Sequence, residues 1–172
     1  MSKTPAAPQW LTAEERRAWL AYIDFSTLLA DHINRQLRRD SGITHADYAL
    51  LSRLSAVPDG ALCMTELAES LKITRSRLTH AVTRLQQAGY VGRREDPTNR
   101  RNQYATLTDR GRSLLEQAAP GHVAAVRRAV FDVLTPDQVH ALAGIGSAIK
   151  GALQDADSTA ADPAEALPWR RR

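Results

Sequence analysis

The chain has 172 residues, 43% hydrophobic and 24% charged, which suits one domain with a buried core. Cys63 is the single cysteine, so an intrachain disulfide and a disulfide-stabilised secreted scaffold are excluded. The N-terminus lacks an apolar signal region, and no stretch approaches the ~20 apolar residues that span a bilayer, so we expect a cytoplasmic protein without a membrane segment.

The net charge of +4 is unevenly distributed along the chain. Residues 72–101 carry eight basic and two acidic side chains, a local charge of +6, whereas the rest of the chain sums to −2. Arginine outnumbers lysine twenty to three, which favours bidentate contacts with phosphate and guanine, although GC-rich genomes also favour arginine codons. This basic block indicates a polyanionic partner.

A long helix and a short one are expected from the N-terminal part of the chain, after a loose arm at residues 1–11. Thr12 and Glu15 have the spacing of a capping box, and the apolar pattern that follows predicts a helix to about residue 39. Thr44 and Asp47 resemble a second cap, followed by a short amphipathic helix at 46–57. The turn signal at 58–60 ends it.

Two short helices and a hairpin are expected next. "MTELAESL", residues 64–71, predicts a helix with Thr65 as a possible N-cap. Residues 75–88 predict a second helix, capped by Thr74 and ended by Gly89 in the left-handed conformation. The segments 90–94 and 103–107 then predict the two strands of a hairpin.

The C-terminal part again predicts helices. One begins at Thr108, and we interpret Pro120 as a kink in a continuous helix. Thr135, Pro136 and Gln138 begin the last helix, whose apolar repeat continues to Leu153. Residues 154–172 are expected to be a disordered tail. The fold class is therefore mainly α with one small β-hairpin.

Residues 64–88 have the pattern of a helix-turn-helix. Leu78, Val82 and Leu85 share one face of the second helix and predict its buried side. The opposite face presents basic and hydroxyl side chains, of types that read base edges in the DNA major groove: Arg75, Ser76, Arg77, Thr79, His80 and Thr83. An ordinary solvated basic face is the alternative, and the arginine-rich hairpin that follows favours the DNA interpretation.

The stretch from "MTELAESLKITRSRLTHAVTRLQQAGYV" through the Asp-Pro wing to "LTDRGRSLL" resembles the MarR family of winged helix-turn-helix transcriptional regulators. The resemblance covers residues 12–153 and implies one domain. Residues 12–40 and 108–153 would be dimerisation helices, and 44–107 the winged helix-turn-helix, with its wing at 90–107. It further implies a homodimer that binds a pseudo-palindromic operator on double-stranded DNA, usually as a repressor and often released by a small molecule.

The resemblance also assigns residue roles. The expected DNA-binding residues lie on the recognition helix and the wing tip, with two phosphate candidates, Thr65 and Arg84: Thr65, Arg75, Ser76, Arg77, Thr79, His80, Arg84, Asn99, Arg100 and Arg101. Asp96 is expected to brace the wing arginines rather than contact DNA. Asn99 departs from the family pattern, in which this position is commonly a second aspartate, and it makes the tip more positive.

Other candidate sites carry weaker signals. Trp19 and Tyr22 could line a pocket for a small aromatic effector, or could pack in the core or a dimer interface. Cys63 could sense oxidants, but its apolar neighbours favour a buried and inert thiol. The five histidines show no metal-binding spacing, and no catalytic or cofactor motif is present, so we expect no metal, no cofactor and no enzyme activity.

Two alternative functions remain open from sequence. A nucleoid-type protein would bind DNA without sequence preference, but aromatic stacking platforms are scarce in the basic block, which holds only Tyr90. A ligand-binding or protein-interaction dimer could have lost DNA binding, against which the basic residues on both helix and wing argue.

Overall fold

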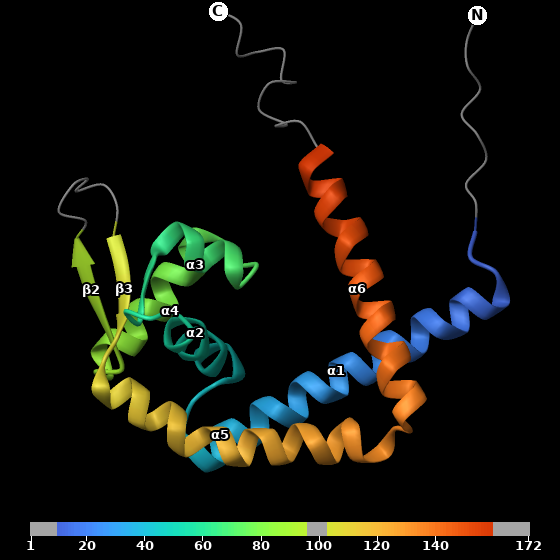
Figure 1. The fold of residues 1–172 in the computed structure, drawn as a ribbon, viewed down its shortest axis with the longest axis horizontal. Helices are drawn as coiled ribbons and strands as arrows, with labels where there is room; N and C mark the ends of the chain where they lie inside the picture. Colours follow the sequence, from blue (N-terminus) through green and yellow to red (C-terminus); the bar gives the residue numbers. More distant parts are fainter. Residues whose placement is uncertain (1–9, 96–102, 160–172) are drawn as a thin grey trace, which may run out of the picture. The chain divides into compact units, whose positions relative to one another are not determined.

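The computed structural model describes residues 10–95 and 103–159. The chain forms two compact units, residues 1–126 and residues 127–172. The described part of the first unit holds all the strands and most of the helices (Figure 1): α1 (Ala13–Ser41), α2 (His45–Ser55), β1 (Ala61–Cys63), α3 (Met64–Ser70), α4 (Arg75–Gln87), β2 (Val91–Glu95), β3 (Gln103–Leu107) and most of α5 (Asp109–Ala129).

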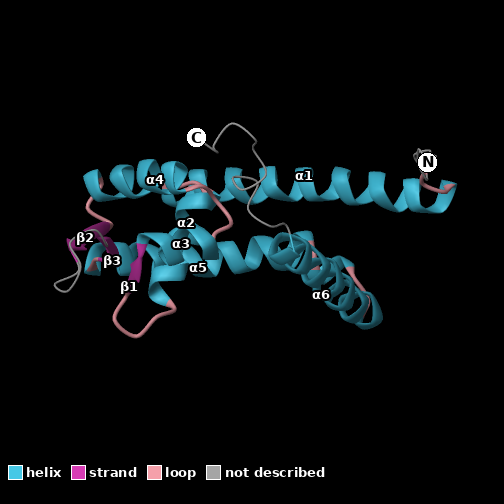
Figure 2. Ribbon diagram, turned by 90° about the horizontal axis from the view of Figure 1, so that it is seen from above, coloured by secondary structure: helices cyan, strands magenta, loops and turns pink. Residues whose placement is uncertain are grey.

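The strands form one antiparallel sheet in the order β1-β3-β2. Val91 pairs with Leu107 and Glu95 with Gln103, so β2 and β3 make the expected hairpin. The third strand, β1, was missed by the sequence analysis, which predicted only two strands. It is three residues long, and its hydrogen-bonded partner is β3, more than forty residues later in the chain. No local sequence pattern therefore predicts it. In Figure 2 the strands lie at the end of this unit away from the N-terminus of α1.

Most predicted helix ends are confirmed. Thr12 and Glu15 form a capping box on α1, and Thr44 and Asp47 form one on α2. The Thr74 hydroxyl accepts the Arg77 N–H at the start of α4. The prediction that Thr65 caps α3 is wrong, because β1 leads directly into the helix and the N-cap is Cys63, without a side-chain hydrogen bond.

Glycines end α1 and α4, and the one that ends α4 was expected. Gly42 has φ 70° and Gly89 has φ 77°, conformations that disfavour any side chain with a Cβ.

The main core lies where α2, α3 and α4 pack against the sheet. Its largest fully buried members come from these elements: Leu50, Leu51, Leu54, Leu67, Leu78, Val82 and Val91. A second, smaller cluster joins α1 to α5 through Ile33, Leu37, Ala118 and Ala125. The predicted buried face of α4 is therefore confirmed, and α4 is held in place by the apolar stripe that the sequence contains.

Helix α5 is continuous through Pro120, as predicted. Its first turn is locked to the end of α4, because the Thr108 hydroxyl donates to the Gly89 carbonyl (2.8 Å) and accepts the Gly111 N–H (3.0 Å). This pair of bonds gives the "LTDRG" motif its structural role.

The second unit is described over residues 127–159. It contains the end of α5, a short 3₁₀ helix at Phe131–Val133, and α6 at Pro136–Thr159. The predicted cap is confirmed, since the Thr135 N–H donates to Gln138 Oε1 (2.9 Å) and the Gln138 N–H donates to Thr135 Oγ1 (3.3 Å). Helix α6 extends beyond Leu153, where we expected the tail to begin, and residues 160–172 lie outside the described part.

Candidate nucleic-acid interface

Helix α4 separates a buried face from an exposed one. Leu78 and Val82 are fully buried in the core, whereas Arg75, Ser76, Arg77, Thr79 and His80 are exposed. Thr83, on the same side, is half-buried. The first turn of α4 contains no acidic residue, so its exposed face presents only basic and neutral hydrogen-bonding groups. The five predicted α4 residues that precede Thr83 are thus brought together on one accessible surface.

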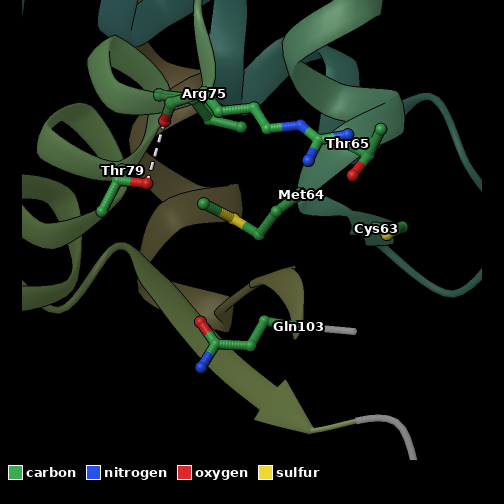
Figure 3. Close-up of a pocket in the computed structure, with 7 residues that line it drawn as sticks. Cys63, Met64, Thr65, Arg75, Thr79 and Gln103 are labelled. Atoms are coloured by element: carbon green, nitrogen blue, oxygen red, sulfur yellow. Dashed lines mark hydrogen bonds between the residues drawn. The ribbon is translucent and has the colours of Figure 1, made fainter. Parts of the chain in front are cut away.

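Beside the first turn of α4 lies a pocket of about 210 Å³. It is lined by residues of β1, α3, α4 and β3: Cys63, Met64, Thr65, Arg75, Leu78, Thr79 and Gln103. Figure 3 shows the Arg75 side chain extending toward Thr65 of α3, with Gln103 on the other side of Met64. Among the described residues of the lining, Arg75 is the one that carries a charge. A guanidinium, a hydroxyl and a carboxamide around one pocket can bind an anion such as a phosphate group.

The wing is attached to α4 by Arg93. Its guanidinium donates to the Thr83 hydroxyl (2.7 Å) and to the Thr79 carbonyl (3.3 Å). Neither acceptor follows from the sequence pattern, because both belong to another element, ten and fourteen residues before Arg93. Arg94, its neighbour, lies over the Tyr104 ring at 5.4 Å, a cation–π distance.

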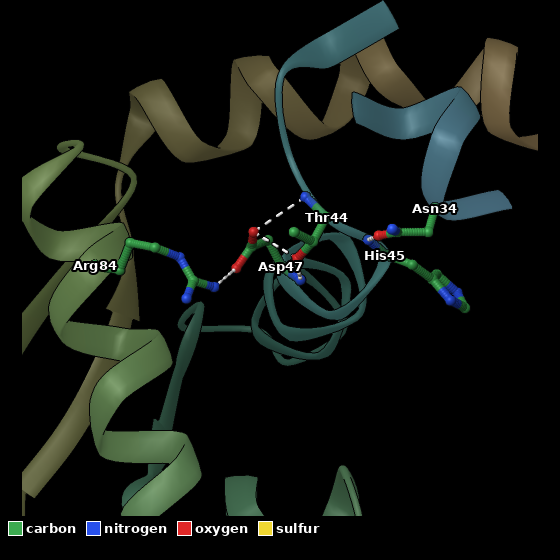
Figure 4. Close-up of polar contacts among 5 residues, drawn as sticks. All are labelled: Asn34, Thr44, His45, Asp47 and Arg84. Carbon is green, nitrogen blue, oxygen red and sulfur yellow. Dashed lines mark hydrogen bonds and ion pairs between the residues drawn. The ribbon is translucent and has the colours of Figure 1, made fainter. Parts of the chain in front are cut away.

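Arg84 is turned toward α2. Its Nη2 forms an ion pair with Asp47 Oδ1, and Asp47 Oδ2 accepts the N–H (3.0 Å) and the hydroxyl (2.6 Å) of Thr44 (Figure 4). From the sequence, Asp47 is predicted only as part of a helix cap. The spacing of the capping box gives no hint of the second partner, which comes from another helix.

The wing tip lies outside the described residues. Asp96, Asn99, Arg100 and Arg101 all fall between the ends of β2 and β3, so their predicted roles as brace and DNA contacts stay predictions. Strand β2 ends at Glu95 and β3 begins at Gln103. These two residues pair with each other, so the wing tip lies between them in the chain.

The candidate effector residues lie on an exposed apolar surface of α1. Trp19 is 54% and Tyr22 48% exposed, and their rings stack with centroids 5.9 Å apart. Neither lines the pocket beside α4. Cys63 is partly exposed rather than buried, because it sits at the junction of β1 and α3 and borders that pocket.

A histidine pair lies where α2 meets α5. His122 contacts the Tyr48 ring (4.4 Å between centroids) and faces His45 (5.9 Å). Burial lowers the pKa of His122, and repulsion from His45 lowers it further. Within residues 10–95 and 103–159, no three potential metal ligands gather at one point. In the same part of the chain, no helix is long and apolar enough to cross a membrane.

The three-stranded sheet, the helix pair α3–α4 and the hairpin that follows define a winged helix-turn-helix protein, which is a class of DNA-binding domain. Comparison with known proteins narrows the class: residues 41–102 match the sequence model of the MarR family. The crystal structure of Sco3205, a MarR family transcriptional regulator from Streptomyces coelicolor solved in complex with DNA, is 52% identical. The aligned region covers 87% of this chain and 93% of the Sco3205 chain, and the TM-score is 0.84.

AbsC, another MarR family regulator from the same organism, is 32% identical with a TM-score of 0.82, over 86% of this chain and 99% of its own. The transcriptional repressor YetL from Bacillus subtilis is 29% identical over 104 residues, which is 60% of this chain and 62% of YetL. The chain therefore belongs to the MarR family of DNA-binding transcriptional regulators, and the resemblance noted in the sequence is confirmed.

Proposed function

We propose that this protein is a repressor that binds a pseudo-palindromic operator on double-stranded DNA as a homodimer. The observation that carries the proposal is the acid-free exposed face of α4, braced by Arg93 against the wing. Helix and wing can then engage adjacent grooves together. Two comparisons support it: Sco3205 was solved with DNA, and YetL is named a repressor.

The proposed contacts follow from this geometry. Ser76, Arg77 and His80 would read base edges, because they are exposed in the first turns of α4. Arg75, Thr65 and Thr79 border the pocket and would hold a backbone phosphate. Asn99, Arg100 and Arg101 would reach the minor groove from the wing, with Asp96 bracing them.

The proposal of a dimer rests on exposed apolar side chains on two helices, α1 and α6. Helix α1 exposes a dense set of large apolar side chains: Trp19, Leu20, Tyr22, Ile23, Phe25 and Leu28. Helix α6 exposes Leu142, Ile145, Ile149 and Leu153. Surfaces of this kind on a water-soluble chain mark interaction sites. Residues 12–40 and 108–153 are therefore proposed as dimerisation helices, and residues 44–107 as the DNA-binding part.

An aromatic effector at Trp19 and Tyr22 remains part of the proposal, since their exposed rings offer a stacking surface. Such a ligand can release DNA only if it binds the DNA-free state more tightly. In this role the protein acts in the cytoplasm and has no catalytic activity.

Selection of binding sites from random duplexes, followed by footprinting, tests the proposal. We expect two half-sites related by two-fold symmetry and about 10 base pairs apart, with affinity that falls steeply with salt. A single asymmetric half-site would contradict the dimer. Equal affinity for selected and random duplexes would favour a non-specific nucleoid protein instead.

A further inference from the structure

Asp47 is a buried carboxylate with partners from two helices. The residue is 4% exposed, and three donors satisfy it: the N–H and hydroxyl of Thr44 on one oxygen, and the Arg84 guanidinium on the other. A carboxylate removed from water is tolerated only with such partners. Asp47 therefore serves α2 as its N-terminal cap and α4 as a counter-ion.

The position of Arg84 on α4 shows on which flank of the helix this ion pair lies. Arg84 follows Arg77 by two helical turns, so both lie on the same flank of the helix. The other flank carries Thr79 and Thr83, which Arg93 of the wing contacts. Helix α4 is thus held on one flank by α2 and on the other by the wing.

The α2 end of the ion pair is itself anchored. The His45 N–H donates to Asn34 Oδ1 of α1 (3.1 Å), one residue from the cap (Figure 4). Polar contacts therefore run from α1 through the first turn of α2 to the third turn of α4, beside the apolar core.

We propose that Arg84 is a positioning residue and not a DNA contact: its ion pair with Asp47 sets the orientation of the recognition helix on α2. The inference rests on the proposed function for its DNA readout. It replaces the expectation that Arg84 binds a phosphate. The Arg84 side chain is 58% exposed, but its guanidinium is held by a buried carboxylate that matches its charge, and its removal should misplace Ser76, Arg77 and His80.

The two roles make opposite predictions for Asp47. If Arg84 binds phosphate, Asp47→Asn frees the guanidinium and adds net positive charge, so DNA affinity rises or stays the same. If Arg84 positions α4, Asp47→Asn weakens operator binding. Salt dependence separates them further, because loss of one phosphate contact reduces the slope of log K against log[salt] by about 0.9.

The experiment measures operator affinity against salt for Asp47→Asn, Arg84→Met and the double variant. We expect each single change to weaken binding roughly tenfold, the double variant to be no weaker than either single, and the salt slope to stay unchanged. The control pair is Asp31→Asn and Arg35→Met, an α1 ion pair outside the exposed apolar set proposed for the dimer. Both side chains are more than half exposed, so the pair should change affinity less than twofold. Tighter or unchanged binding by Asp47→Asn, or a flatter slope for Arg84→Met, would overturn the proposal.

Amide hydrogen exchange of the free protein provides a readout without DNA. We expect faster exchange of α4 amides in Asp47→Asn and in Arg84→Met, with no further increase in the double variant. Wild-type protection of α4 in Asp47→Asn would refute the brace. Arg84→Met leaves the buried Asp47 carboxylate without its counter-ion and could unfold the protein. In that case the near-isosteric Asp47→Asn variant still tests whether the ion pair positions α4. If the wild type selects no duplex, the proposed function is contradicted. The hydrogen-exchange result still tests whether the ion pair between Asp47 and Arg84 holds α4 in place.

Discussion

Gly111 is required by a close approach between α5 and the start of the wing. A Cβ at this position would lie 2.1 Å from the Tyr90 carbonyl oxygen, which is backbone and cannot swing away. We expect Gly111→Ala to destabilise the fold by about 1–3 kcal/mol, the usual cost of overpacking. Denaturant unfolding measures it.

The control is Gly144→Ala in α6, where an added Cβ meets no atom within 4 Å. This change should be neutral or stabilise the helix by about 0.5–1 kcal/mol, because alanine is the better helix former. Equal unfolding free energies for Gly111→Ala and the wild type would show that β2 and α5 shift apart at little cost.

His122 is expected to make stability depend on pH. Its pKa is lowered by burial and by His45, so below about pH 6.5 the unfolded chain takes up a proton that the folded chain resists. Stability is therefore lost as the pH falls through this range. The melting temperature should drop more between pH 7.5 and 5.5 for the wild type than for His122→Phe, which keeps a ring against Tyr48. Equal drops would exclude His122 as the cause.

At the scale of elements, the Arg93 side chain links the wing to α4 through the Thr83 hydroxyl and the Thr79 carbonyl. Thr83→Val removes the hydroxyl that Arg93 contacts but leaves every charge in place. We expect operator affinity to fall a few-fold, since one hydrogen bond contributes about 1 kcal/mol net, with no change in salt slope.

Thr83→Ser keeps the hydroxyl and is the matched control, which should bind as the wild type does. A Thr83→Val variant with full affinity, beside an Arg93→Met variant that binds weakly with a flatter salt slope, would show instead that Arg93 contacts DNA directly.

At the scale of the whole molecule, the exposed apolar residues of α6 are expected to hold the dimer together. Ile145 and Ile149 are 57% and 52% exposed, and Ile145→Asp with Ile149→Asp would place two charges on that surface. We expect sedimentation to show monomers and operator affinity to be largely lost, because a two-fold operator needs both copies. Lys150→Gln, an exposed change on the same helix, is the control. A monomeric wild type would contradict the dimer.

The sequence by itself determined the six α-helices of the described residues, most of their caps and the face of α4 that is buried, because these depend on local spacing and on 3.6-residue periodicity. The capping boxes at Thr12, Thr44 and Thr135 and the buried stripe of α4 were all predicted in this way. The motifs that resemble the MarR family also identified the class of protein, and the comparisons confirmed it.

Only the tertiary structure decided what joins these elements to one another. Strand β1 exists because β3 pairs with it, the Thr83 hydroxyl accepts the Arg93 guanidinium because the wing folds back, and Asp47 becomes a counter-ion because α4 packs beside α2. Each contact links residues far apart in the chain, where periodicity and cap spacing carry no information. Arg84 shows the consequence: its residue type suggested a phosphate, and its neighbour in the fold is a buried carboxylate.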